Sequence, residues 1–321
     1  MKFRLITSLY TVVIFGMKSL NFAVLGDEAV AVQLAKIGSK SDITFYEKRT
    51  SDAILCLIAP SSFPEKVQPL IQTIALAEYV ILNPPKIDKA LGEQIVALDN
   101  IKIERGFIIS SWLDDELRSF IKSTILEKYQ FVTLEELRQK LESLPEVPQD
   151  GQAKVLVDAS FEVKGVGTVA LGVVRRGTIN QHDELEVFPQ KKPVSVRSIQ
   201  MHDDDVNSAH SPARVGLSIR GLTAKEIERG DIVGSPNSLQ ISNELRIKFE
   251  KSRFYKGEIS PSWTYHLCIG LQIKPVRVKV DNDMVITAEK PMAFEPQEKC
   301  LILDLNSAST RIVGNGTIIK A

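Results

Sequence analysis

The chain has 321 residues, of which 44% are hydrophobic and 25% are charged, a composition typical of folded globular proteins with two or three domains. Its 40 lysine and arginine residues balance its 40 aspartate and glutamate residues. Net charge therefore gives no reason to expect nucleic-acid or membrane binding, and any basic surface has to be local. Cys56, Cys268 and Cys300 are widely separated, which argues against a disulfide framework or a metal site and favours reduced thiols in a cytoplasmic protein.

Residues 1–16 combine Lys2 and Arg4 with an apolar stretch, as the beginning of a signal peptide does. The stretch is short for a bilayer span, Lys18 interrupts it, and no small-residue cleavage site follows. Met17 begins the run M-K-S-L-N-F-A-V-L-G, which is typical of the first buried strand of an α/β domain. We therefore expect residues 1–16 to be an N-terminal extension without a role in the fold.

Residues 17–145 are predicted to form an α/β domain. The strand-like runs are 21–26, 42–48, 53–60, 78–84 and 105–111, and the helical patterns are 28–36, 65–77, 88–98, 114–129 and 133–144. Apolar strands separated by helices predict a parallel sheet that is covered on both faces. In the last helix, Thr133 and Glu136 form a capping-box pattern.

The remainder of the chain is predicted to be all-β. Residues 146–152 contain proline, glycine and polar residues, as a linker does. Short alternating strands then fill residues 153–236, and a second set fills residues 237–321, with glycine, asparagine and aspartate at the turns. These patterns predict two antiparallel β-barrels that follow the α/β domain.

The barrel predicted at residues 153–236 carries the most specific motifs. As the second domain of the chain it is called the second barrel, and the barrel at residues 237–321, the third domain, is called the third barrel. Residues 161–189 contain a G-x-G-T-V strand, and residues 213–236 contain Arg220-Gly221 and the run E-I-E-R-G. These segments resemble the second domain of translational GTPases, especially elongation factor Tu and its selenocysteine-specific relative SelB. Residues 310–321 are similar to the closing strand of the third domain of the same factors. The chain as a whole is similar to archaeal SelB-like proteins with degenerate nucleotide motifs.

The resemblance implies a P-loop-GTPase-like first domain, in which the phosphate loop reads G-x-x-x-x-G-K-[ST]. Counted from Gly26, the expected glycine, lysine and hydroxyl are replaced by Ala31, Val32 and Gln33. Asp27 and Glu28 stand instead at the positive end of the next helix, where each carboxylate contributes ~0.3–1 kcal/mol to helix stability. A phosphate oxygen ~4 Å from such a carboxylate would be repelled by about 4 kcal/mol at an effective dielectric constant of 20. We therefore predict that this loop no longer binds phosphate.

The other nucleotide motifs are also incomplete. Residues 17–145 contain no D-x-x-G, and the run from 42 to 60 passes from strand to strand without room for switch segments. The guanine-reading N-K-x-D motif is echoed by Asn83, Lys86 and Asp88, which two prolines interrupt, and I-S-S-W at 109–112 stands where the family has S-A-K. With Gly26, these are the candidate residues of a degenerate nucleotide site. Turn residues between a strand and a helix explain them equally well, so we expect a pseudo-GTPase that is not an enzyme and needs no cofactor, with GTP and magnesium as the alternative.

Two segments are candidates for RNA contact. The resemblance implies that the E-I-E-R-G segment lies by the terminal adenosine of tRNA, with Glu226 at the base and Arg229 and Arg220 near it. The alternative is that Glu226 and Arg229 hold a tight turn, which Gly230 also suits. Basic residues alternate with aromatic ones over 246–257, and their charge favours contact with phosphate. The candidates there are Lys248, Lys251, Arg253 and Lys256, and the alternative is a charged strand edge that prevents aggregation.

No other constellation predicts catalysis or metal binding. The run His202–Asp205 is rich in oxygen ligands but lacks regular ligand spacing, and the histidines form no ligand pair. The sequence thus predicts an elongation-factor-like protein that binds tRNA or the ribosome without GTP, with no DNA or membrane partner. A divergent GTP-binding elongation factor is the alternative, and a scaffold that docks a protein partner is a third interpretation.

Overall fold

The computed structural model describes residues 17–109, 114–281 and 283–320. The expected extension at residues 1–16 and most of the I-S-S-W motif lie outside the described residues. The chain forms two compact units. Of the described residues, the first comprises 17–20, Glu47–Cys56 and Pro145–Gln240, and the second comprises Asn21–Tyr46 and those within 57–144 and 241–320.

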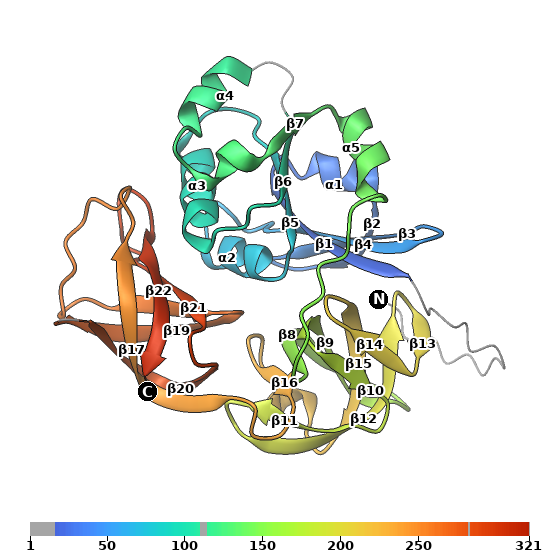
Figure 1. The fold of residues 1–321 in the computed structure, drawn as a ribbon. Coiled ribbons are helices and arrows are strands. Elements are labelled where there is room, and N and C mark those ends of the chain that lie inside the picture. Colours follow the sequence, from blue (N-terminus) through green and yellow to red (C-terminus); the bar gives the residue numbers. More distant parts are fainter. Residues whose placement is uncertain (1–16, 110–113, 282, 321) are drawn as a thin grey trace. The chain divides into compact units, whose positions relative to one another are not determined.

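A seven-stranded sheet with the strand order β2-β3-β4-β1-β5-β6-β7 forms the centre of the α/β fold (Figure 1). Its strands are β1 (Lys18–Gly26), β2 (Lys36–Lys40), β3 (Thr44–Arg49), β4 (Ala53–Ala59), β5 (Tyr79–Asn83), β6 (Gly106–Ile109) and β7 (Gln130–Val132). β1, β5, β6 and β7 pair in parallel. β4 is buried along its whole length and β1 and β5 along most of theirs, as strands covered on both faces are. The predicted parallel sheet is therefore confirmed.

The two edges of this sheet differ from the predicted elements. The helical pattern at 28–36 is shorter, since α1 is Ala29–Leu34 and β2 follows it at once. The pattern at 114–129 divides into α4 (Asp114–Phe120) and a 3-10 turn, η1 (Ile125–Lys128), before β7. Ser123 has a φ of 61°, and the hydroxyl of Thr124 accepts the Leu126 amide. These local bonds end one helix and begin another.

The helices α2 (Gln68–Ala75) and α3 (Lys89–Ile101) bury their apolar sides in one core with alternate residues of β1 and β5, such as Ala23, Leu25, Val80 and Leu82. Every second residue of a strand faces this core, and the helices contribute apolar residues that recur every 3.6 positions. The last helix, α5 (Leu134–Leu141), has the predicted capping box between Thr133 and Glu136. Within the described part of the chain, no helix is long and apolar enough to cross a bilayer.

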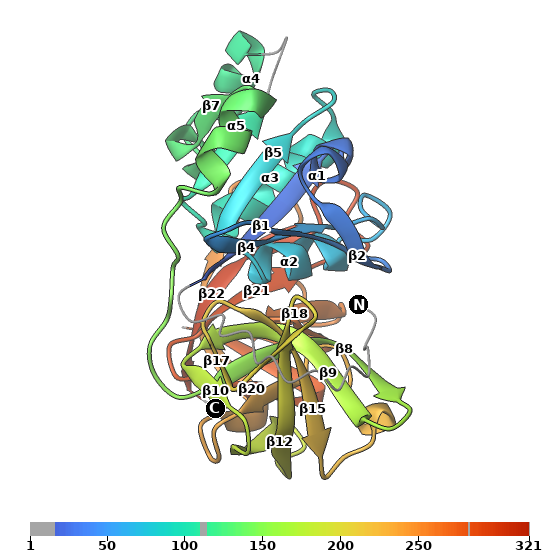
Figure 2. The ribbon, with the colours of Figure 1, turned by 90° about the vertical axis from the view of Figure 1, so that its right-hand side faces the viewer.

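The second barrel belongs to the first compact unit. Its strands are β8 (Lys154–Val163), β9 (Gly167–Arg176), β11 (Glu184–Phe188), β12 (Lys192–Met201), β13 (Asp204–Val206), β15 (Arg214–Arg220) and β16 (Ile232–Gly234), beside a small β10 (Thr178–Asn180) and β14 (Ser208–His210) pair. The order β11-β16-β8-β9-β15-β12 closes through a β11–β12 pairing, and Figure 2 shows β8, β9, β15 and β12 running together. Inward residues of every strand form a single aliphatic core.

The third barrel belongs to the second compact unit. Its six strands close in the order β17-β20-β19-β18-β21-β22, with β17 (Gln240–Lys251), β18 (Tyr265–Ile269), β19 (Gln272–Val280), β20 (Met284–Phe294), β21 (Lys299–Leu303) and β22 (Ile312–Lys320). Within this unit, the buried Glu93 of α3 accepts hydrogen bonds from the backbone amide and guanidinium of Arg311, whose guanidinium also donates to the Pro64 and Glu65 carbonyls. Leu303 and Ile312 also join the core of α2 and α3. The three cysteines are buried and outside any disulfide.

Candidate nucleotide- and RNA-binding sites

The loop after β1 is shaped by a close approach to β5. Gly26 stands opposite Asn83 in the parallel register, and a Cβ atom at Gly26 would lie 2.1 Å from the Asn83 carbonyl oxygen. Gly26 also has a φ of +96°, a conformation that favours glycine. The structure thus brings together two of the predicted nucleotide-site residues, and the packing of two backbones accounts for the glycine.

The backbone amides of this loop donate hydrogen bonds within the chain. The Asp27 amide donates to the Asn83 carbonyl (2.8 Å), and the Ala29 amide donates to the Asp27 carboxylate (2.9 Å). The amides of Val30, Ala31 and Val32 donate to the carbonyls of Asp27 and Glu28. A phosphate loop depends on such amides pointing at an anion. In this loop, five backbone amides already donate to acceptors within the chain. The helix that follows, α1, has only six residues.

The carboxylate of Glu28 is held by two hydroxyl groups. It accepts hydrogen bonds from Tyr46 of β3 and from Ser61 after β4 (3.2 Å), and the Ser61 hydroxyl is 2.6 Å from that of Thr44. Burial and the neighbouring Glu28 raise the pKa of Tyr46, so this phenol stays a donor. Glu28 therefore does not cap α1 with its side chain. Its side chain is thereby held beside the loop.

The loop between β5 and α3 is also held by its own side chains. Asp88 is the N-cap of α3, and its carboxylate accepts the Leu91 amide (2.9 Å). Lys86 lies 3.5 Å from the same carboxylate. The structure thus brings these two candidates of the N-K-x-D echo together. Helix capping accounts for the aspartate in the way that Asp commonly serves at N-caps.

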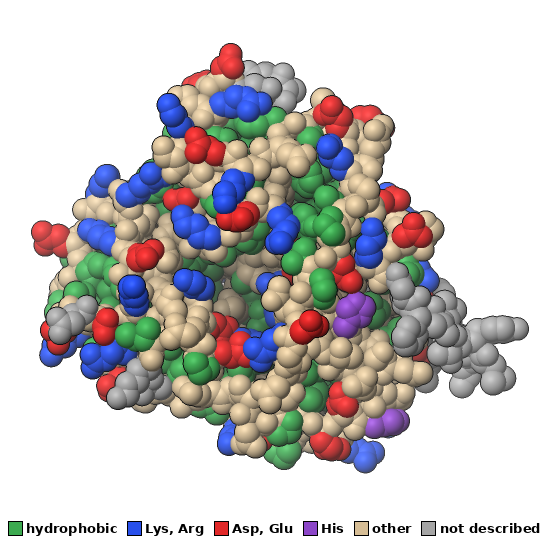
Figure 3. All heavy atoms as spheres, in the orientation of Figure 1, with side chains coloured by type: hydrophobic (Ala, Val, Ile, Leu, Met, Phe, Trp, Pro, Cys, Tyr) green, Lys and Arg blue, Asp and Glu red, His purple; other side chains and the backbone are tan. Residues whose placement is uncertain are grey.

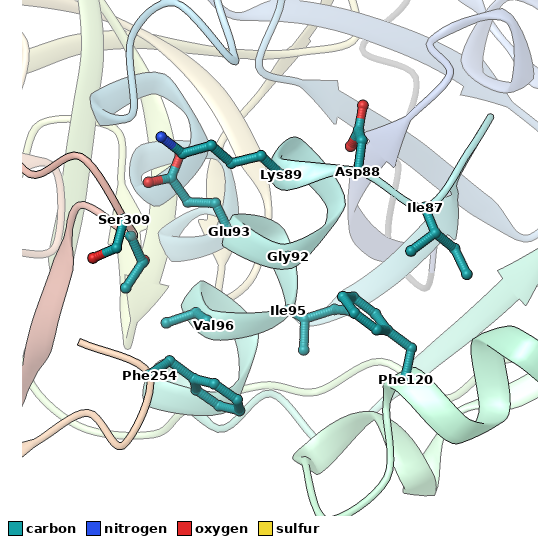
Figure 4. A pocket seen from close by; sticks show the side chains of 11 residues that line it. Ile87, Asp88, Lys89, Gly92, Glu93, Ile95, Val96, Phe120, Phe254 and Ser309 are labelled. Atoms are coloured by element: carbon teal, nitrogen blue, oxygen red, sulfur yellow. The ribbon is translucent and has the colours of Figure 1, made fainter. Parts of the chain in front are cut away.

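A groove of about 500 Å³ runs along α3 (Figure 4), and sequence reasoning did not identify it. Its apolar side chains include Ile87, Ile95, Val96, Phe120 and Phe254. Gly92 also lines it, and a Cβ atom there would meet nothing within 4 Å, so the helix backbone is open to the groove. A glycine inside a helical pattern was the one sequence signal for it, since glycine costs a helix interior ~1 kcal/mol relative to alanine.

On the second barrel, Glu226 lies in the 3-10 turn η2 (Ala224–Glu226). Its carboxylate accepts hydrogen bonds from Lys192 (2.7 Å) and from the amide (3.0 Å) and hydroxyl (2.9 Å) of Thr223. The contacts with Lys192 and Thr223 lower the pKa of Glu226 to about 2. Arg229 donates to the Asp158 carbonyl (3.0 Å). These contacts agree with the alternative interpretation of this segment, in which Glu226 and Arg229 hold a tight turn.

Arg220 lies at the end of β15, apart from that turn. It lines a hollow of about 420 Å³ with His182, Glu184, Ser195, Val196 and Arg197, which we call the Arg220 hollow. The polar residues of this hollow other than Arg220 were not identified from the sequence. The pairing of β11, β12 and β15 brings these residues together, and no local sequence pattern predicts that pairing.

The basic segment of the third barrel makes several internal contacts. Lys251 donates to the Gly257 carbonyl (2.8 Å), and Lys256 donates to the Arg253 carbonyl (3.2 Å). Arg253 donates to the Ser123 carbonyl and its guanidinium lies 4.7 Å from the centre of the Phe254 ring. Lys248 is exposed on β17. On the face of the molecule in Figure 3, basic and acidic side chains are interspersed.

The oxygen-rich run His202–Asp205 forms ion pairs and hydrogen bonds. His202 lies 2.9 Å from Glu47, Asp204 pairs with Arg49, and Asp205 accepts from Gln200 (2.9 Å). The hydrogen bond with Glu47 raises the pKa of His202. Among the described residues, no three His, Cys, Asp or Glu side chains are grouped as ligands of a metal ion.

Comparison with protein families identifies the second barrel. Residues 167–234, which run from β9 to β16, match the family described as elongation factor Tu domain 2. The resemblance of residues 161–189 and 213–236 to that domain is therefore confirmed.

Curated relatives extend the match along the chain. The uncharacterized protein MJ0325 of Methanocaldococcus jannaschii is 33% identical over 310 residues, which are 94% of this chain and 100% of that protein. A selenocysteine-specific elongation factor of the same organism is 28% identical over 211 residues, 57% of this chain and 45% of that protein. Elongation factor 1-alpha of Saccharolobus solfataricus is 35% identical over 117 residues, 36% and 27% of the two chains. The chain thus spans less than half the length of these two elongation factors.

Solved structures show the same architecture. The elongation factor SelB of Methanococcus maripaludis, in complex with the GTP analogue GppNHp, has a TM-score of 0.80 at 21% identity and covers 95% of this chain and 79% of its own. Its apo form has a TM-score of 0.80 at 22% identity, with 95% and 80% covered. Both consist, like this chain, of a parallel-sheet α/β domain followed by two β-barrels. The chain therefore belongs to one family with MJ0325, its second barrel is an elongation factor Tu domain 2, and its fold is that of the elongation factor SelB.

Proposed function

We propose that this chain is an elongation-factor-like protein that binds RNA of the translation machinery, a tRNA end or the ribosome, without using GTP as a switch. One observation carries the GTP-independent part. In the loop after β1, five backbone amides are bonded within the chain, and Asp27 and Glu28 belong to the loop that the resemblance assigns to a nucleotide's phosphates. By the same reasoning the chain does not hydrolyse GTP and needs no cofactor.

The pairing of β3 with β4 supports the same proposal. The two strands are neighbours in the sheet and are joined by residues 50–52 alone, which is a hairpin connection. A nucleotide switch works by ordering and releasing a loop around the γ-phosphate and its Mg²⁺. A hairpin leaves no such loop between these strands.

The RNA-binding part of the proposal rests on the second barrel. The family match covers this barrel, and the relatives include factors named as elongation factors. Exposed arginines on the barrel supply the charge that phosphate contacts need. A tRNA or ribosome partner and a cytoplasmic location belong to the same proposal.

Calorimetry with GTP, GDP and Mg²⁺ tests the first part, and no heat up to millimolar nucleotide is the expected result. Binding of tRNA and of ribosomal subunits over a series of salt concentrations tests the second part. Glu226→Gln keeps the acceptor for Thr223 but removes the charge, so it is a better probe than a truncation. The exposed Glu228→Ala is the matched control on the same segment. RNA affinity that is independent of salt and of Glu226→Gln would count against a tRNA end at this turn.

A second candidate is a divergent elongation factor that still binds guanine nucleotide. The likeness in fold to a SelB solved with a GTP analogue favours it. A micromolar constant in the same calorimetry would establish it in place of the first candidate. A third candidate, a scaffold for a protein partner, is favoured by the apolar groove along α3.

A further inference from the structure

The Arg220 hollow is built on a row of three paired residues. Glu184 of β11 is opposite Ser195 of β12, and Ser195 is opposite Arg220 of β15. Residues opposite each other in a ladder point to the same face, and this face is outside the barrel because Glu184 and Arg220 are exposed. Neighbouring strands are ~4.8 Å apart, so the row spreads an acid, a hydroxyl and a guanidinium over ~10 Å.

A β-bulge adds a second arginine to this row. The β12–β15 register shifts between Val196 and Ser198, which leaves Arg197 as the extra residue. Bulges change the direction of a side chain and often lie beside functional sites. Arg197 lines the hollow and is exposed, and its guanidinium donates to the Val166 carbonyl (3.2 Å). The bulge therefore brings a partly anchored guanidinium beside that of Arg220.

The turn before β11 is tied to the same bulge. His182 has a φ of 73°, and its amide donates to the Val196 carbonyl (2.8 Å). The side chain of Gln181 donates to the Arg197 carbonyl (2.9 Å). The backbone that carries the His182 imidazole is therefore held by hydrogen bonds to β12, which lines the same hollow.

The two arginines of the hollow form no ion pair with a carboxylate of the described residues, although Glu184 lines the same hollow. Two guanidinium groups can hold one phosphate through charge-assisted hydrogen bonds. The carboxylate of Glu184 would repel a second phosphate group. Because a carboxylate accepts hydrogen bonds, it favours a ligand with a hydroxyl or amino donor beside the bound phosphate.

We propose that the Arg220 hollow binds a single ribonucleotide unit of an RNA strand. Its phosphodiester lies between Arg197 and Arg220, and a ribose hydroxyl donates to Glu184. The 2′-hydroxyl is the group that distinguishes RNA from DNA, and imidazole and guanidinium planes can stack on a splayed base. The volume is within the usual range for a small-ligand site. This inference rests on the proposed function, because it names one contact of the proposed RNA-binding surface.

The test measures binding of a short single-stranded RNA and of the DNA of the same sequence by fluorescence anisotropy over a salt series. Arg197→Gln and Arg220→Gln are each expected to weaken RNA binding about tenfold, since hydrogen bonds to charged groups are worth about a factor of ten or more. Losing the phosphate contact should also reduce the slope of log K against log salt by ~0.7. Lys36→Gln, an exposed charge on β2, is the control that should change neither quantity.

Glu184→Gln should reduce the preference for RNA over DNA, because an amide no longer accepts the ribose hydroxyl as strongly. An unchanged affinity and salt slope in the Arg197→Gln/Arg220→Gln double variant would overturn this inference and leave the proposed function standing. If the wild-type chain binds neither this RNA nor tRNA nor ribosomal subunits, the proposed function fails. Titration with adenosine monophosphate then decides the hollow itself: shifts of the Ser195 and Val196 amide resonances support it, and their absence refutes it.

Discussion

Neutralising the two acids of the β1–α1 loop separates charge from geometry as the reason for the proposed loss of GTP binding. In the double variant Asp27→Asn/Glu28→Gln, the repulsion of a phosphate oxygen at ~4 Å is removed, which is about 4 kcal/mol per carboxylate at an effective dielectric constant of 20, or about 8 kcal/mol for the two. That corresponds to about a millionfold in affinity. The amides remain bonded within the chain. Redirecting five of them to a phosphate costs about 1 kcal/mol each, or about 5 kcal/mol in all.

The geometric cost thus offsets more than half of the electrostatic gain, and the lysine of a phosphate loop is still absent, since Val32 stands in its place. We expect calorimetry with GTP, GDP and Mg²⁺ to detect no binding below millimolar nucleotide in either the wild type or the double variant. Asp52→Asn/Asp150→Asn, two exposed acids elsewhere, is the matched control.

Two outcomes would refute this reasoning in different ways. Micromolar affinity in the double variant alone would mean that charge by itself closed the loop and that its amides are easily redirected. Micromolar affinity in the wild type would mean that the loop still accepts phosphates, and the GTP-independent function would fall with it.

Three further predictions concern stability, each measured by urea unfolding. Gly92→Ala should raise the free energy of unfolding by ~0.5–1 kcal/mol, because a Cβ there meets nothing and alanine favours the helix; a loss of stability would show that α3 needs the glycine. Arg311→Ala should lower it by about 3–5 kcal/mol, because it leaves the buried Glu93 without its cation; a loss below ~1 kcal/mol would contradict a structural role for this pair. The pair of His202 and Glu47 should make stability depend on pH. The raised pKa of His202 means that its contribution is complete below pH ~6.5 and is lost as pH rises through the folded-state value, whereas the lowered pKa of Glu47 means that its contribution is present above pH ~4.5 and is lost on acidification. His202→Gln should therefore reduce the difference in unfolding midpoint between pH 6 and pH 8, and an unchanged difference would exclude this pair as its source.

Elements whose interactions are local or strongly patterned could be predicted from the amino-acid sequence. The apolar runs of β1, β4 and β5 predicted buried strands, because hydrophobic residues on both faces suit a covered sheet. The capping box of Thr133 and Glu136 was readable because its hydrogen bonds join residues three positions apart. The motifs of the second barrel likewise identified its family without the structure.

Features that depend on residues distant in the sequence could be seen only in the folded chain. The edge strands β2 and β7 exist because neighbouring strands supply their hydrogen bonds, which no periodicity in their own short sequences records. Glu28 finds its partners in Tyr46 and Ser61, 18 and 33 residues away. A strand register and a bulge, both set by pairing between strands, place Arg220 with Arg197 and away from the turn of Glu226. Local free energies specify the elements, but the groups that meet at a site are chosen by long-range packing, whose partners a linear pattern does not contain.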